Sequence, residues 1–380
     1  MVNSNADAIG IIFPNSYDSL VPELVSERLM ASIPFASRYR MVDFVISSMV
    51  NCGIDNISLI VRKNYHSLMD HLGSGREWDL TRKNGGLNIV PPFAQKNVKI
   101  YNGRVEALQS IKRFMQSQKQ KYVILSDVNI AMNFDFKALL DTHMESGADI
   151  TVVYNRQEIP ESFKNPAFAG KDMYTALDLQ GDKVTEVKLN PVNSGVQNLS
   201  MNIFVLDRER LIQLIDDAYL HGQILFERDI LAPKVKELDV RGFLYEGYIA
   251  RINDLRSYFR ENIKLLDEKN LDSLFNGNQI YTKIRDDNPT RYLSGSKVKN
   301  VMAADGCIIE GEVENCVLFR GVKIGKGAKV KNCVLMQDTV IGANADIEYI
   351  ITDKNAVIGE NKRLAGNDTF QVYVAKHQVV

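Results

Sequence analysis

A spacing of six residues between small or apolar side chains is the strongest constraint in this sequence of 380 residues. Three interleaved columns share this spacing: Cys316, Val322, Ala328, Val334 and Val340; Leu318, Ile324, Val330 and Met336; and Gly321, Gly327, Cys333 and Thr339. Strands have a period of two and helices one of about 3.6, so neither produces a strict six. The triangular coil of a left-handed parallel β-helix does, because each of its faces takes one hexad. We expect this architecture over residues 296–380, with a slip in register within 341–347.

Strand-like and helical patterns alternate along residues 1–268. Three continuous apolar segments without glycine are typical of strands that are covered on both faces: ISLIV (57–61), YVILS (122–126) and ITVVY (150–154). Helical patterns cover residues 41–52 and 102–118, and a further helix is expected over 254–268. This alternation predicts an α/β domain with a mostly parallel sheet, which binds its ligands beyond the carboxyl ends of the strands.

Three other segments break this alternation. Residues 175–189 and 240–252 alternate polar with apolar side chains, which predicts an antiparallel flap or edge. Residues 269–295 mix Asn, Gly, Asp and Pro without a sustained period, which is typical of a linker. A single hydrophobic core stops growing at roughly 250 to 300 residues. We therefore expect two domains joined by this linker.

The composition limits the classes of partner. Lysine and arginine (46) almost balance aspartate and glutamate (47), whereas a surface for nucleic acid or membrane normally carries a basic excess. No apolar run is long enough to cross a membrane, and the N-terminal residues lack the pattern of a signal peptide, so a cytoplasmic protein is expected. The four cysteines lack zinc-ligand spacing and are expected to be buried thiols: Cys52, Cys307, Cys316 and Cys333.

The loop after the first expected strand, residues 8–13, is unusual. In an α/β sheet such a loop commonly binds a phosphate through bare backbone N–H groups, and it is rich in glycine for that reason. Residues 14–20 contain no glycine, and Asp18 adds a negative charge. The loop therefore either forms a different kind of site or has lost the ability to bind a phosphate.

Three stretches resemble a known family. They are RYRMVDFVISSMVNCGI (38–54), DHLGSGREWDLTRKNGGLNIVPPF (70–93) and the hexad repeat that follows NPTRYL (288–293). Together they resemble bacterial glucose-1-phosphate adenylyltransferase, also called ADP-glucose pyrophosphorylase, over nearly the whole chain. The resemblance implies a Rossmann-like nucleotidyltransferase domain followed by a left-handed β-helix. It also implies a role in making ADP-glucose and pyrophosphate from ATP and glucose 1-phosphate for glycogen synthesis, under control by metabolites.

The residues that this family uses for phosphate binding are missing. Its G-G-x-G-x-R loop falls on residues 15–20, where no glycine remains and the arginine has become Leu20. Asp18 is expected to repel a nucleotide there. The lysine of the family's K-P-A motif aligns with Met30, and the sugar-phosphate lysine of its E-K-P motif aligns with Asn190. The nucleotide pocket is thus expected to survive only as a remnant: Asn15, Ser16, Asp18 and Tyr101, the last at the position of the tyrosine near the adenine.

The magnesium ligands of the family are also incomplete. Asp127 matches the first metal-binding aspartate and is either a vestigial ligand or a residue that caps a turn. The second metal-binding aspartate corresponds to Arg251, which cannot bind Mg²⁺ and is expected to compete for the remaining carboxylate. Each lost cation or metal ligand near a phosphoryl group is expected to reduce transition-state stabilisation by about 3 kcal/mol or more.

These losses predict a subunit with no catalytic residues, which resembles the catalytically degenerate, regulatory GlgD type. The resemblance implies a hetero-oligomer, expected as a tetramer, with a homologous catalytic subunit that holds the Mg²⁺; this chain itself requires no cofactor. Homo-oligomerisation of the chain alone is a further expectation. The alternative is a functional adenylyltransferase that uses rearranged residues. An acyltransferase built on the hexad repeat is disfavoured, because no histidine occurs between His221 and His377 to act as a base.

Four cationic residues are candidates for binding a phosphorylated metabolite as effector. Arg38 and Arg40 match the family's K-F-R segment, and Lys362 and Arg363 lie near its basic C-terminal element. The alternative is a solvated or salt-bridged surface. Phosphate binding requires that these side chains converge on one pocket.

Overall fold

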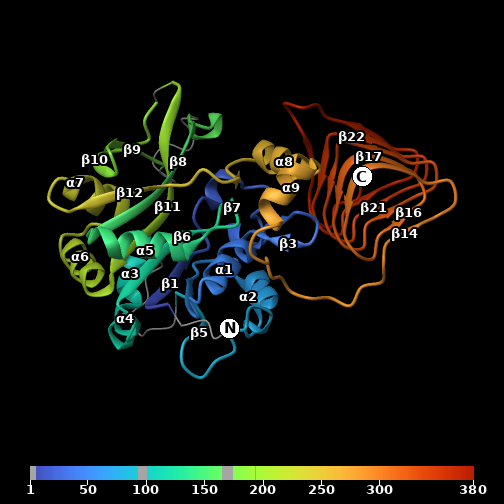
Figure 1. Ribbon diagram of the computed structural model, residues 1–380. Coiled ribbons are helices and arrows are strands. Elements are labelled where there is room, and N and C mark those ends of the chain that lie inside the picture. Colours follow the sequence, from blue (N-terminus) through green and yellow to red (C-terminus); the bar gives the residue numbers. More distant parts are fainter. Residues whose placement is uncertain (1–5, 93–100, 165–173, 193) are drawn as a thin grey trace.

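The computed structural model describes residues 6–92, 101–164, 174–192 and 194–380. Phe93 of the PPF motif lies outside them. Figure 1 shows two parts, an α/β domain that contains the N-terminus and a coil of short strands that contains the C-terminus. In the described part of the chain, no helix combines the length and the apolar character needed to cross a membrane.

One mixed sheet of nine described strands organises the first part. Its order is β5 (Gly86–Val90), β4 (Asn56–Ile60), β1 (Ala8–Phe13), β6 (Tyr122–Asp127), β11 (Val196–Asp207), β8 (Ile150–Glu158), β12 (Val240–Leu244), β10 (Lys183–Leu189) and β9 (Thr175–Gln180). Neighbours are parallel from β5 through β6 and between β8 and β12, whereas β11 runs antiparallel to both β6 and β8. The described strand β10 also pairs antiparallel with both β12 and β9. The prediction of an α/β domain is confirmed, but its sheet is mixed rather than mostly parallel.

Helices cover both faces of this sheet, as Figure 1 shows. Their bounds are α1 (Met41–Asn51), α2 (His66–Leu72), α3 (Arg104–Ser110), α4 (Lys112–Ser117), α5 (Phe136–Ser146), α6 (Arg208–Leu220), α7 (Ala232–Lys234), α8 (Leu255–Lys264) and α9 (Glu268–Phe275). Because side chains of a strand alternate between its faces, Ala8 and Ile12 of β1 enter one core and Ile9 and Ile11 enter the other. This double burial explains the continuous apolar run.

Several element boundaries differ from the predictions. The helix expected over 102–118 is interrupted at Ile111, which separates α3 from α4. The helix expected over 254–268 ends at Lys264, and α9 occupies the start of the segment expected as a linker. The antiparallel hairpin over 175–189 is present as β9 and β10. Within 240–252, β12 pairs antiparallel with β10 on one side but parallel with β8 on the other, so the antiparallel prediction holds for that segment only in part.

The C-terminal part is a parallel β-helix, as the hexads predict. Two sheets run along the coil, and all their pairs are parallel. The described strands are β14 (Arg291–Tyr292), β15 (Lys297–Ala303), β16 (Ile308–Ile309), β17 (Glu312–Leu318), β18 (Lys323–Ile324), β19 (Lys329–Lys331), β20 (Val334–Leu335), β21 (Val340–Ile341), β22 (Asp346–Glu348), β23 (Ile350–Thr352), β24 (Val357–Ile358), β25 (Arg363–Ala365) and β26 (Val372–Val374). The strand β14 lies within the segment expected as a linker.

The coil repeats after 17 residues over most of its length, not after the 18 of three full hexads. Paired positions show the spacing: Glu312, Lys329, Asp346 and Arg363 follow one another across β17, β19, β22 and β25. Residues in the left-handed region mark the corners in three columns: Gly306, Gly321, Asp338 and Asn355; Asn300, Asn315, Asn332 and Tyr349; and Gly327, Asn344 and Asn361. Gly, Asn and Asp tolerate this conformation best. Gly321 and Gly327 therefore lie at corners, whereas Cys333 and Thr339 are buried inside, and the third predicted column was wrong as a single column.

One face of the coil carries a ladder of alternating charge. It begins at Lys297, which pairs in register with Glu312, and continues through Lys329, Asp346 and Arg363. The Lys297 Nζ lies 2.7 Å from the Glu312 carboxylate. On another face, apolar side chains such as Val317 and Ile351 join the core of the α/β domain. The coil is thus attached to the domain by a shared hydrophobic core.

Candidate functional site

The loop after β1 is held by its own side chains. Asn15 Nδ2 donates to Asp18 Oδ2 at 2.8 Å, and the backbone N–H of Met30 donates to Asp18 Oδ1, also at 2.8 Å. Asn15 Oδ1 accepts from the backbone N–H of Arg62 at 2.8 Å. The Asp18 carboxylate therefore fixes the loop, a role that the sequence did not indicate. These contacts replace the ring of free N–H groups that a phosphate would need.

Apolar side chains fill the positions where the family has cations. Leu20 and Met30 are both buried in the core beneath the loop. Tyr17 adopts a left-handed backbone conformation (φ 65°), and its buried hydroxyl accepts a hydrogen bond from Asn202 Nδ2. Burial raises the pKa of Tyr17, and the neighbouring Asp127 adds to this effect, so the phenol stays neutral. Buried apolar and aromatic side chains thus pack beneath this loop.

The one carboxylate that matches a metal ligand of the family is already paired with a guanidinium group of this chain. Asp127, at the end of β6, accepts from Ser16 Oγ at 2.6 Å and pairs with Arg104 Nη2 at 2.5 Å. Arg104 also pairs with Glu227, which lies on the π-helical turn Phe226–Leu231. The guanidinium carbon lies 5.0 Å from the centre of the Phe13 ring. Asp127 is thus already neutralised from within the chain.

This cluster contains one cation, Arg104, and two carboxylates, Asp127 and Glu227. Burial alone lowers the pKa of Arg104, but Asp127 and Glu227 outweigh it and the pKa is raised, so the guanidinium remains charged. Burial raises the pKa of Glu227, and Arg104 offsets this only in part. One cation faces two carboxylates, so the cluster favours a proton on Glu227. A phosphate would meet no net positive charge from these three residues.

The cavity beside this cluster is small. Its volume is about 130 Å³, below the roughly 300–1,000 Å³ of typical ligand pockets. Of the residues expected in the pocket remnant, Asn15, Ser16 and Tyr101 line this cavity, whereas Asp18 is not among its lining residues. The Tyr101 hydroxyl donates to the backbone carbonyl of Val61. Groups of three or more His, Cys, Asp or Glu side chains that could hold a metal ion are absent from the described residues.

Two expected site residues have other roles. Arg251 does not reach Asp127; its Nη2 donates to Asn155 Oδ1 at 2.9 Å. The expected competition of Arg251 for that carboxylate was therefore wrong, and Arg104 takes the place instead. Asn190 pairs with Tyr174 at the open end of the β9–β10 hairpin: its N–H donates to the carbonyl of Tyr174 at 2.9 Å, and its Oδ1 accepts from the Tyr174 N–H at 3.0 Å.

A second cavity lies where the α/β domain meets the coil, and we call it the junction cavity. Its volume is about 570 Å³. Six cationic side chains line it: Arg38, Arg40, Lys283, Arg285, Arg320 and Lys354. The structure thus brings Arg38 and Arg40 together. Lys362 and Arg363 lie outside this lining, and Arg363 Nε is 3.8 Å from Asp346 on the coil.

Burial and mutual repulsion affect the cations of the junction cavity. Burial and, to a smaller extent, the neighbouring Arg40 and Arg28 together lower the pKa of Lys354 to about 7. Burial also lowers the pKa of Arg320, with Arg38 as the next cause. Arg40 is held in place by Ser67, whose backbone oxygen accepts from its Nη1 at 2.6 Å. An anion in this cavity would relieve the repulsion among these groups.

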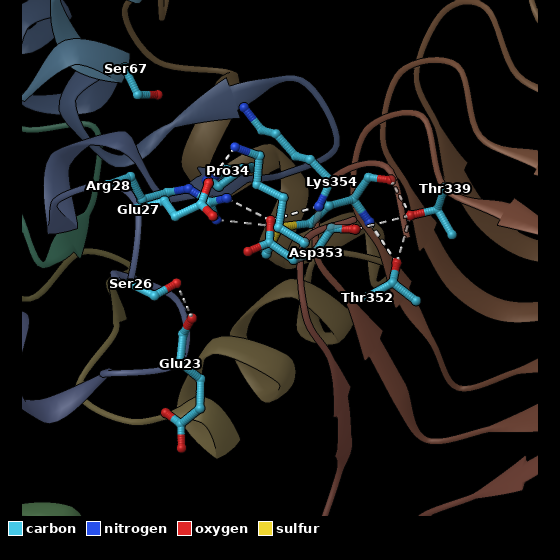
Figure 2. A network of polar contacts seen from close by, with 12 residues as sticks. Glu23, Ser26, Glu27, Arg28, Pro34, Ser67, Thr339, Thr352, Asp353 and Lys354 are labelled. Atoms are coloured by element: carbon cyan, nitrogen blue, oxygen red, sulfur yellow. Dashed lines mark hydrogen bonds and ion pairs between the residues drawn. The ribbon is translucent and has the colours of Figure 1, made fainter. Parts of the chain in front are cut away.

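An ion pair beside this cavity joins the two parts of the chain. Figure 2 shows Arg28, from the segment between β1 and β2 (Pro34–Phe35), reaching Asp353 on the coil. The Nη2–Oδ1 distance is 2.6 Å, and the side chains are only 3% and 1% exposed. Asp353 also accepts from the Tyr373 hydroxyl at 2.8 Å. Lys354 follows directly in sequence, so this pair fixes one wall of the junction cavity.

Comparisons with known proteins agree with this architecture. The model of the nucleotidyl transferase family matches residues 23–165, and that of the GlmU-like C-terminal hexapeptide family matches 285–372. Glycogen biosynthesis protein GlgD of Bacillus subtilis (strain 168) is 32% identical, with 86% of this chain and 83% of that protein covered. GlgD of Geobacillus stearothermophilus is 35% identical over the same shares. The chain belongs to the GlgD and glucose-1-phosphate adenylyltransferase family.

Relatives that are named as enzymes lie in the same family. The glucose-1-phosphate adenylyltransferase of Geobacillus stearothermophilus is 29% identical, with 85% of this chain and 82% of the enzyme covered. The resemblance to the GlgD and glucose-1-phosphate adenylyltransferase family is thus confirmed. So is the order of the two domains, with the nucleotidyltransferase domain before the hexapeptide coil. The sequence did not point to Arg104 and Glu227, although Arg104 follows Tyr101 closely in YNGRVEAL.

Proposed function

We propose that this chain is a regulatory subunit of glucose-1-phosphate adenylyltransferase in glycogen biosynthesis, and that it transfers no adenylyl group by itself. It pairs in the cytoplasm with a homologous catalytic subunit to form a hetero-oligomer, expected as a tetramer. The GlgD relatives support the glycogen pathway. The site geometry supports the lack of catalysis.

The single observation that carries this proposal is the ion pair between Arg104 and Asp127. Adenylyl transfer requires that Mg²⁺ and cationic side chains neutralise the charge that develops on the phosphoryl group. Here a guanidinium already uses the one carboxylate that matches a metal ligand, and Leu20 and Met30 replace two cations. In the complex, the catalytic subunit would hold the Mg²⁺, and this chain requires no cofactor of its own.

Regulation would operate through the junction cavity and the interface with the catalytic subunit. A phosphorylated metabolite suits this cavity, because six cationic side chains line it. The bound anion would act on the coil through Lys354 and on the domain through Arg38 and Arg40. To alter the response of the catalytic subunit, the interface must favour one of its states by about 1–3 kcal/mol.

The test compares three preparations: this chain alone, a catalytic relative alone, and the two combined. Pyrophosphate release and the mass of the complex are measured in each. We expect no release from the chain alone, one complex in the mixture, and a shifted effector response. Sustained ADP-glucose synthesis by the chain alone would establish the alternative, an enzyme with a rearranged site. Two separate species in the mixture would refute the partnership.

A further inference from the structure

A third cavity lies between the end of β8 and helix α8, and we call it the β8–α8 cleft. Its volume is about 840 Å³, which is within or near the range of ligand pockets. Its walls come from residues 155–161, from residues 244–254 and from α8. Arg251, on the short strand β13 (Ala250–Arg251), is among the lining residues.

The Arg251 side chain is a buried cation without a counter-ion among the described residues. It is only 7% exposed. Its Nη2 donates to Asn155 Oδ1 at 2.9 Å and its Nη1 lies 3.5 Å from the Ser200 carbonyl, but its buried Nε has no hydrogen-bond partner. In contrast, the equally buried Arg28 has the Asp353 carboxylate at 2.6 Å.

A lone buried charge is expensive. Removing an ion from water carries a penalty of several kcal/mol, even after the protein relaxes around it. Accordingly, burial lowers the pKa of Arg251 to about 10. The side chain nevertheless faces a cleft large enough for a ligand. An anion in the cleft would supply the missing charge.

The planar shape of the Arg251 guanidinium group indicates the class of ligand that it can bind. A guanidinium presents paired N–H donors in a planar fork that matches two oxygens of one phosphate or carboxylate group. Amide side chains of Asn155, Gln157 and Asn253 line the same cleft and suit a ligand that also carries hydroxyl groups. Exposed Arg156 and Arg256 lie on the same lining.

We propose that the β8–α8 cleft binds the oxyanion group of a small metabolite, with Arg251 as its anchor. The shared chemistry is a two-oxygen anion, carried by either a phosphate ester or a carboxylate. This site is separate from the junction cavity, and it does not depend on the proposed regulatory role. The position that would hold a metal-binding carboxylate in the family thus carries an anion-binding cation in this chain.

The experiment measures thermal unfolding of the full chain with inorganic phosphate, with acetate and with chloride at matched ionic strength. The junction cavity also attracts anions, so each titration is repeated in an Arg38→Ala/Arg40→Ala background. We expect a saturable stabilisation by phosphate or acetate over chloride in this background. Arg251→Gln should weaken it about thirtyfold or more, since a buried charge loses its partner. Arg113→Gln, at an exposed arginine of α4 outside the cleft, should leave it unchanged.

The unfolding of the ligand-free variants gives a second measurement. Because Arg251 is an uncompensated charge, Arg251→Gln should unfold at the same temperature as the parent or higher in chloride alone. Arg251→Lys keeps the charge but loses the fork, so we expect intermediate anion affinity. The proposal is overturned if neither phosphate nor acetate stabilises the Arg38→Ala/Arg40→Ala background more than chloride does. It is also overturned if Arg251→Gln retains the parent's affinity.

Discussion

Replacing Arg104 by methionine should destabilise the chain strongly. The substitution keeps an unbranched side chain beside Phe13, but it removes the cation that pairs with Asp127 and Glu227. The Asp127 and Glu227 side chains are only 1% and 10% exposed, so both carboxylates would be left buried without a counter-ion. Breaking a buried pair in this way costs about 3–5 kcal/mol. We expect a loss of that size in the free energy of unfolding near neutral pH.

The loss of stability in the Arg104→Met variant should depend on pH. A buried carboxyl without a counter-ion has a pKa above its unfolded value, so the folded state binds the proton more tightly. The stability of the Arg104→Met variant is therefore preserved in acid and falls as the pH rises through the raised pKa values. Urea unfolding near neutral pH and near pH 5 should show the larger deficit, relative to the parent, at neutral pH.

Glu227→Gln is the matched control. Burial already raises the pKa of Glu227 in the parent, so this residue weakens the folded state as the pH rises above about 4.3, its unfolded value. Glutamine leaves one cation for one carboxylate, and the variant should be as stable as the parent or more so at neutral pH. A deficit for Arg104→Met below about 1 kcal/mol, or one that is equal at both pH values, would refute the reasoning.

Three further predictions concern the coil and its junction. Arg28→Ala should lower the free energy of unfolding by about 3–5 kcal/mol, and a double-mutant cycle with Asp353→Ala should show strong coupling; additive losses in urea unfolding would contradict this. Burial lowers the pKa of Lys354 to about 7, so the binding of an anionic effector, measured by calorimetry, should weaken as the pH rises through 7. Lys354→Gln should reduce this dependence of binding on pH. If binding to the parent does not depend on pH, Lys354 has no part in binding the effector. Gly327→Val should destabilise the coil by about 1–2 kcal/mol more than Gly327→Asn in thermal unfolding, because Asn344 occupies the same left-handed corner one coil later; equal effects would exclude the corner argument.

The fold could be predicted from the sequence because its signals are local. The apolar run of β1 and the pattern of α1 depend on neighbours within a few residues, and both elements formed as expected. The hexads likewise identified the β-helix. The coil length of 17 residues was not predicted, because a strict spacing of six does not reveal that one corner takes a residue fewer.

The candidate site was less predictable, since its decisive contacts connect distant parts of the chain. The positions of Leu20 and Met30 indicated that the cations were lost. Arg104 meets Glu227 across 123 residues of sequence, and no local pattern marks such a pair. Lys362 was nominated from the resemblance to the family, whereas Lys354, eight positions earlier, lines the junction cavity. The resemblance alone did not reveal which residues of the coil face the domain.

The alternating ladder on the coil affects how such coils can associate. It starts with Lys297 on the first coil and finishes with Arg363 on the last one, so both ends present a cation. Within the coil, neighbouring side chains of the ladder carry opposite charges. If two molecules stacked end to end in continuous register, Arg363 of one would lie next to Lys297 of the other, and these like charges would repel each other. An odd number of rungs thus discourages growth into a filament, although each open end offers unpaired backbone groups.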